Sequence, residues 1–173
     1  VNIARGKAKE EEAYKIELLM NKAGITTKDR KVVEAALKRA EETGDTAAAL
    51  ELPDGRLITG KTSELLGACS ALLIKALKVL ADIDRDVLLI TPNVIMPIQK
   101  LKVNYLGSRN PLLHMEEVLI ALSASSESSE LADLALRQLP RLRGSQVHTS
   151  RMLSDTDEKT FQKLGVMLTS EPR

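Results

Sequence analysis

The segment that most constrains the fold is residues 63–82, SELLGACSALLIKALKVLAD. If it forms a helix, apolar side chains fill most of its circumference and leave only a narrow polar stripe of Lys75, Lys78 and Asp82. A helix that is apolar nearly all round has to be covered by other elements on several sides. The segment therefore predicts a long helix, beginning at Ser63, in the middle of the domain.

Segments on both sides of this helix predict strands. Residues 46–60, TAAALELPDGRLITG, place apolar runs before and after a Pro-Asp-Gly turn, which is typical of a β-hairpin. Residues 86–91, DVLLIT, form a short continuous apolar run, as a central parallel strand does. Residues 146–153 and 166–170 predict two more strands, and a helix capped by Ser154 lies between them.

Apolar residues recur at helical spacing along much of the remaining chain. Residues 16–23 and 26–44 predict two helices that pair as a charged antiparallel hairpin, the second ending at Gly44. Later helices are predicted for residues 91–107, 115–122 and 131–139. The motif VLIAL in the second of these three is also compatible with a strand.

This order of elements indicates an α/β protein. We expect a helical hairpin over residues 1–44, followed by a three-layer α/β/α domain with a mixed sheet over residues 45–173. A helical insertion is expected at about residues 107–144. The succession of helix, hairpin and then alternating helices and strands resembles the cytidine-deaminase-like architecture.

Zinc deaminases of that architecture carry H-x-E at the start of the helix after the hairpin and P-C-x-x-C at the start of the next one. The Glu and the Pro of these motifs are present here as Glu64 and Pro92. The three ligand positions hold Thr62, Asn93 and Met96, whose hydroxyl, amide and thioether are not zinc donors. We therefore expect neither a metal nor a cofactor. Glu64 is then either an acid or base without a metal-activated water, or a carboxylate that suits a helix N-terminus.

Residues 55–62, GRLITGKT, match G-x-x-x-x-G-K-[ST], the phosphate-binding loop of nucleotide-binding proteins. Such a loop needs backbone N–H groups that wrap around phosphates, whereas Leu57 and Ile58 favour a buried strand. A hairpin turn at Gly55, a strand and a helix start explain the same residues better. Lys61, close to a helix N-terminus, can still attract an anion.

The loop LGSRNP, residues 106–111, is a further candidate site, because Ser108, Arg109 and Asn110 offer polar groups beside a helix end. His114 follows it, and Glu116 or Glu117 lies near that imidazole. Two isolated histidines in the whole chain are more typical of structural roles than of a metal site.

Composition narrows the classes of partner. The chain has 25 basic and 24 acidic residues, a net charge of +1 and 2% aromatic residues, so neither nucleic acid nor an anionic membrane is expected as a partner. Cys69 is the single cysteine, which excludes an internal disulfide and a cysteine-rich zinc site. Inside an apolar helix its thiol is expected to be inert. We expect a cytoplasmic protein.

Five blocks of the sequence resemble the C-terminal part of a family of bacterial proteins known as domain of unknown function 1846: KIELLMNKAGIT, ELPDGRLITGKTSELLGACSALLIKAL, PIQKLKVNYLGSRNPLLH, EVLIALS and MLSDTDEKTFQKLGVMLTSEP. The resemblance implies a larger cytoplasmic protein with a Rossmann-like N-terminal portion that has its own Gly-rich loop. It also implies a deaminase-like C-terminal region. Some members carry an ATP-dependent peptidase label, which no motif here supports. The family supplies no established catalytic residues.

Two classes of function are expected. The first is a structural or assembly module, or one wall of an interdomain ligand site, in a longer protein. Its partners would be the N-terminal domain of that protein and further copies of the chain, and the absence of a starting Met also favours a fragment. The alternative is a metal-free enzyme domain acting on a small anionic or nucleotide-like substrate. There Glu64, Asn93 and Lys61 would share a pocket with Arg109 or His114.

Overall fold

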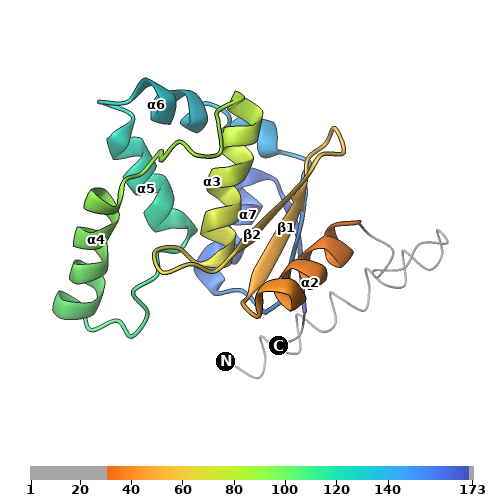
Figure 1. Ribbon diagram of the computed structural model, residues 1–173, viewed down its shortest axis with the longest axis horizontal. Helices are drawn as coiled ribbons and strands as arrows, with labels where there is room; N and C mark the ends of the chain where they lie inside the picture. The colour runs from red at the N-terminus through yellow and green to blue at the C-terminus, as the bar shows by residue number, and fades with distance from the viewer. Residues whose placement is uncertain (1–30, 172–173) are drawn as a thin grey trace.

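The computed structural model describes residues 31–171 and has a mixed α/β fold, shown in Figure 1. The first helix predicted for residues 1–44, and with it the helical hairpin, lies outside the described residues. The elements in chain order are α2 (Lys31–Thr43), β1 (Ala47–Glu51), β2 (Leu57–Lys61), α3 (Ala68–Ala81), α4 (Pro92–Lys100), the π-helical turn η2 (Leu101–Tyr105), α5 (Met115–Ser125), α6 (Glu130–Leu136), the 3₁₀ turn η3 (Leu139–Leu142), β3 (Gln146–Thr149), α7 (Asp155–Leu164) and β4 (Met167–Ser170).

The described strands form one sheet in the order β2-β1-β3-β4. Strand β1 is antiparallel to both neighbours, and β3 runs parallel to β4. The predicted hairpin is confirmed, with Leu50 opposite Ile58. Gly55 has a φ of 93° in its turn, a conformation that side chains with a Cβ rarely adopt. The Asp54 side chain accepts a 3.0 Å hydrogen bond from the N–H of Arg56 and closes the turn.

Helices cover both faces of this sheet, as Figure 1 shows with α2 on one side and α3 and α7 on the other. Alternation along β1 explains the two layers. Ala49 packs with Val32, Val33 and Ala36 of α2 in a small cluster. Leu50 belongs to the large core on the opposite face, together with most of α3.

Helix α3 has the central position that its apolar circumference predicts, but its predicted start is wrong. The helix begins at Ala68 instead of Ser63, with Gly67 in an extended conformation before it. The preceding backbone pairs with the chain before α5: Leu113 donates a 3.0 Å bond to the Leu65 carbonyl, and Gly67 donates a 3.2 Å bond to the Leu113 carbonyl. This long-range pairing competes with helix formation and has no local signal.

The strand predicted over residues 86–91 is also wrong. The segment is irregular, with Leu89 and Ile90 buried in the core and Leu88 66% exposed. An Asp84 carboxylate that accepts a hydrogen bond from the Asp86 N–H turns the chain here. The place beside β1 that this strand would take is occupied by β3. A short apolar run therefore marks burial here without marking a strand.

The other described elements agree with the predictions, except that the strand predicted over residues 146–153 ends at Thr149. The region that was also compatible with a strand is helical, as α5. The helix predicted from residue 91 to 107 consists of α4 and η2, with Pro97 inside α4. Ser154 caps α7 by accepting a hydrogen bond from the Asp157 N–H, and Gly165 ends that helix. Within residues 31–171, no helix has the length and apolar content needed to span a membrane.

Candidate functional site

The residues of the deaminase-like comparison lie in separate local settings. Glu64 is exposed in the irregular stretch before α3, and its backbone carbonyl accepts a 3.2 Å bond from the Gln99 side chain at the end of α4. Asn93 is exposed in the first turn of α4. Thr62 donates to the Thr46 carbonyl at 3.3 Å. Among the described residues, no hydrogen bond or ion pair joins these side chains to one another.

The phosphate-loop match has a structural explanation. Its residues form the hairpin turn and strand β2, so their backbone N–H groups are not arranged around a phosphate. A Cβ placed on Gly60 would lie 2.7 Å from the backbone nitrogen of Leu72, which means that α3 rests directly on this glycine. Lys61 lies 3.8 Å from the carboxylate of Asp45. Gly55 therefore serves the hairpin turn, and Gly60 allows α3 to pack against β2.

The loop of residues 106–111 uses its polar groups to fold itself. Ser108 and Asn110 bond to each other through side chain and backbone at 3.2 Å. The Asn110 Oδ1 atom accepts a 3.0 Å bond from the N–H of Leu112. Arg109 is left exposed beside this turn. The loop therefore has a defined shape and presents the exposed guanidinium of Arg109.

A cluster of polar contacts surrounds Glu117, in the first turn of α5. Its Oε1 atom accepts bonds from the Lys102 Nζ atom at 2.7 Å and from the His114 N–H at 3.1 Å. His114 Nε2 lies 3.3 Å from the same oxygen. Lys102 also donates to the Leu112 carbonyl at 2.6 Å. We call these three side chains the Glu117 cluster.

Burial makes the Glu117 cluster a structural link. The side chains of Lys102 and Glu117 are only 12% and 20% exposed, so water screens their attraction weakly. Lys102 lies on η2 and Glu117 on α5, so the ion pair ties the π-helical turn to the body of the domain. π-Helical turns are frequent at functional sites. His114 stands out in the sequence, whereas Lys102 does not, because its partner Glu117 lies fifteen positions away.

Asp157 extends this region to α7. Its Oδ1 atom accepts a 3.0 Å bond from the Met115 N–H. Burial raises the pKa of Asp157, and the bond from Met115 and the nearby His114 oppose that rise. Burial, assisted by the negative charge of Asp157, raises the pKa of the Cys69 thiol well above its ordinary value. Cys69 is therefore kept as a thiol, in agreement with its expected inertness.

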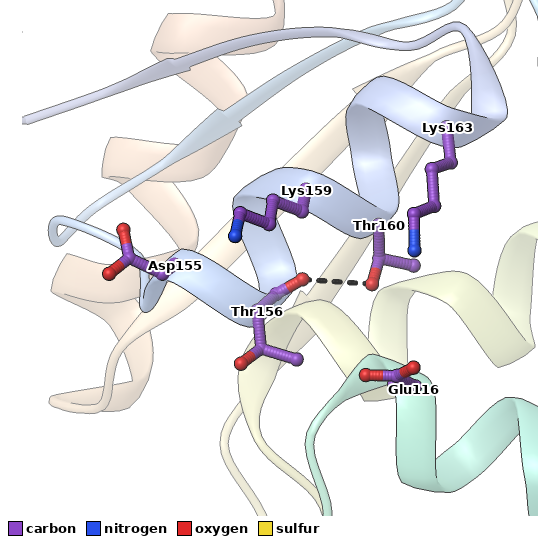
Figure 2. A pocket seen from close by; sticks show the side chains of 6 residues that line it. All are labelled: Glu116, Asp155, Thr156, Lys159, Thr160 and Lys163. Carbon is purple, nitrogen blue, oxygen red and sulfur yellow. Dashed lines mark hydrogen bonds between the residues drawn. The ribbon is translucent and has the colours of Figure 1, made fainter.

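A hollow of about 220 Å³ runs along α7, from Asp155 to Lys163, and Glu116 at the start of α5 also lines it. Figure 2 shows Lys159 and Lys163 extending from α7, with Glu116 on the opposite wall. Thr160 donates a 2.8 Å bond to the Thr156 carbonyl in its floor. Asp155 also lines the hollow, so two ammonium groups and two carboxylates face it, which suits a small polar or zwitterionic group better than an apolar one.

No group of three or more potential metal-ligating side chains occurs within residues 31–171. The described part of the chain thus offers one linked polar region, at the starts of α5 and α7. It contains His114 from the sequence prediction and not Glu64, Asn93 or Lys61.

A second surface feature is apolar. Residues 92–106, comprising α4, η2 and Leu106, form an arm at the edge of the molecule farthest from α2 (Figure 1). Its exposed apolar side chains are Met96, Leu101, Val103, Tyr105 and Leu106. Tyr105 is 71% and Leu106 72% exposed, whereas only Ile95 of the arm is fully buried. Several large apolar side chains exposed within fifteen residues indicate an interaction site.

Comparison with known proteins connects this domain to larger ones. The family model described as "Domain of unknown function DUF1846, C-terminal" matches residues 28–173. A UPF0371 protein of Corynebacterium glutamicum (strain R) is 55% identical over 159 residues, which are 92% of this chain and 32% of the relative. A UPF0371 protein of Streptococcus thermophilus (strain CNRZ 1066) is 51% identical over 158 residues, again 32% of its length. The chain thus spans about a third of the curated relatives it matches.

Proposed function

This chain belongs to the DUF1846 C-terminal domain family, and from this premise we propose that it is an assembly module of a longer protein. The family description gives no function, and the relatives are named only as UPF0371 proteins. The module either holds protein chains together through its surface or forms one wall of an interdomain ligand site. A cytoplasmic location stays a prediction.

The observation that carries this proposal is the exposed apolar arm. Burying an apolar side chain is worth about 1.5–3 kcal/mol, so leaving several exposed on adjacent turns is unfavourable unless another surface covers them. The Glu117 cluster supports the same conclusion. Lys102 already has two partners inside the domain, so its ammonium serves to hold the arm and not to bind a substrate.

A test uses a chimera, in which this chain replaces the matched 159 residues of the Corynebacterium glutamicum relative. Light scattering would compare the mass of the chimera with that of the relative's preceding region alone, after circular dichroism has shown that both are folded. We expect a larger assembly when the module is present. Equal assembly states would contradict an assembly role.

We also propose that the fold is related to the cytidine-deaminase-like architecture. Its support is the antiparallel β1–β2 hairpin, β3 on the other side of β1, the parallel β4 and the packing of α3 on the sheet. On this proposal Thr62, Asn93 and Met96 stand where a metal-binding relative would have ligands. A metal analysis of purified protein that returns zinc at one ion per chain would refute the metal-free part.

The second candidate function is a metal-free enzyme domain for a small anionic or nucleotide-like substrate. The hollow along α7 supports it, because Lys159 and Lys163 line it and each offers an ammonium group, beside the carboxylates of Asp155 and Glu116. Binding of inorganic phosphate or ADP to the chimera, measured by calorimetry, should weaken on Lys159→Ala with Lys163→Ala. If turnover is found, Glu64→Gln tests the acid or base expected from the sequence, and unchanged turnover would remove Glu64 from the mechanism.

A further inference from the structure

We propose that two copies of this chain associate by placing the arm of each copy against the outward face of α5 in the other. This inference rests on the proposed assembly function and names its contact. The outward face of α5 carries a second hollow, separate from the one along α7, with a volume of about 530 Å³. It is lined by Ile120, Ser123, Ala124 and Glu127, and in this subsection "the hollow" means this one. Ile120 is 65% exposed within it.

The arm has the chemistry of an interface anchor. Tyr105 is one of three aromatic residues in the whole chain, yet it is among the most exposed apolar side chains in residues 31–171. Aromatic residues concentrate at the centres of protein interfaces, because a rigid ring buries much area at little entropic cost. Leu106 beside it is equally exposed. These two side chains match the apolar part of the hollow, which is formed by Ile120 and Ala124.

Charge gives the arm and the hollow opposite signs. Residues 87–115 contain no aspartate or glutamate, although the chain has 24 acidic residues. Lys100 of the arm is exposed, Arg109 is exposed three residues beyond the arm, and Lys102 is paired with Glu117. The hollow instead ends in the exposed carboxylate of Glu127, and Glu130 follows at the start of α6. An apolar and basic arm therefore complements an apolar and acidic face.

The arm does not cover the hollow of its own chain, so the hollow is open to the matching arm of a second copy. Lys102 fixes η2 to Glu117 and to the Leu112 carbonyl, at the start of α5. In this position Ile120, one turn further along α5, is still mostly exposed. Each copy offers one arm and one hollow, so a two-fold arrangement closes with two identical contacts and leaves neither feature free.

Sedimentation equilibrium of the chain tests the contact. We expect a dimer whose dissociation constant rises about tenfold or more on Tyr105→Ser with Leu106→Ser. Met167→Ser is the matched control, because Met167 is an apolar side chain 57% exposed on β4, outside both features. It should leave the dissociation constant unchanged.

Charge reversal distinguishes this geometry from other dimers. Lys100→Glu alone and Glu127→Lys alone should each weaken the dimer, because like charges then face each other at both contacts. An equimolar mixture of these two variants should recover dimers, since every contact again joins opposite charges. Failure of the mixture to recover dimers, with the single variants weakened, overturns the pairing.

Further outcomes separate this inference from the proposed function. A chain that stays monomeric at about 100 μM overturns the inference. If the chain alone is monomeric but the arm is protected from hydrogen exchange in the chimera, the inference is also overturned. The preceding region of the relative is then the occupant of the arm's surface. In that case the proposed assembly function is still tested separately, by whether the chimera forms a larger assembly than the preceding region alone.

Discussion

Asp157, in the first turn of α7, accepts a 3.0 Å hydrogen bond at Oδ1 from the backbone N–H of Met115, the first residue of α5. The first N–H groups of a helix have no partner within it, so one carboxylate here satisfies the start of a different helix. Negative charge is favourable at both helix starts because of the helix dipole. The bond joins residues 42 positions apart and fixes α5 against α7.

Replacing Asp157 should therefore destabilise the domain. Asp157→Ala leaves the Met115 N–H without its acceptor, and we expect the free energy of unfolding to fall by about 1–2 kcal/mol. Asp157→Asn keeps an acceptor oxygen and should lose less. Urea denaturation followed by circular dichroism measures both. Equal losses for the two variants would show that the charge, and not the hydrogen bond, is what matters.

The same residue predicts a pH dependence. Burial raises the pKa of Asp157 above its ordinary value of 3.8. The folded protein then binds this proton at a higher pH than the unfolded chain does, so its contribution to stability increases as pH falls through the raised pKa toward 3.8. The stability of the wild type relative to Asp157→Asn should rise between about pH 7 and about pH 4. A difference that stays constant or falls contradicts the raised pKa.

Much of the fold follows from local signals in the sequence. The Pro-Asp-Gly turn predicts the β1–β2 hairpin, and the Ser154 cap with Gly165 predicts both ends of α7. The apolar circumference of residues 68–81 predicts that α3 is central. Each of these signals is contained within a few residues. Local sequence therefore suffices for the element and its burial.

The errors in the fold come from contacts between distant segments. The backbone of Leu65 and Gly67 pairs with Leu113, which delays the start of α3 and leaves Glu64 outside any helix. Residues 86–91 are apolar because Leu89 and Ile90 enter the core, yet β3 has taken the strand position beside β1. Neither the pairing with Leu113 nor the position of β3 can be recognised from the residues of the segment that it affects.

The candidate site was predictable only in part, for the same reason. His114 and its neighbouring glutamates stand out in the sequence as the one place where an imidazole lies near carboxylates. Lys102 and Asp157 reach this place from η2 and α7. In the sequence Lys102 lies among apolar residues and resembles an ordinary solvated lysine. Only the folded chain shows that it pairs with Glu117.

Breaking the Lys102–Glu117 pair should loosen the arm. Lys102→Met removes the ammonium and leaves the Glu117 carboxylate half-buried, so we expect a loss of about 2 kcal/mol in the free energy of unfolding. Hydrogen exchange should also increase in residues 92–106 more than in α3. The variant combining Lys102→Met with Glu117→Gln should lose less than the sum of the two single variants. Strict additivity would mean that the pair contributes nothing.

Gly60→Ala gives the sharpest test of the role of the GRLITGKT motif. In a strand interior Ala is normally better than Gly by about 0.5–1 kcal/mol. Here the added Cβ would lie 2.7 Å from the Leu72 nitrogen, so α3 has to move and we expect a loss of about 1–3 kcal/mol instead. Gly67→Ala is the matched control, because its Cβ would meet the nearest atom, the Leu113 oxygen, at an ordinary 3.8 Å. It should cost about 0.5 kcal/mol, from the weaker helix cap.

Urea denaturation gives the sign of the change in stability directly. A stabilised Gly60→Ala variant would contradict the packing role, and a variant of unchanged stability that lost a measured nucleotide affinity would return the motif to phosphate binding.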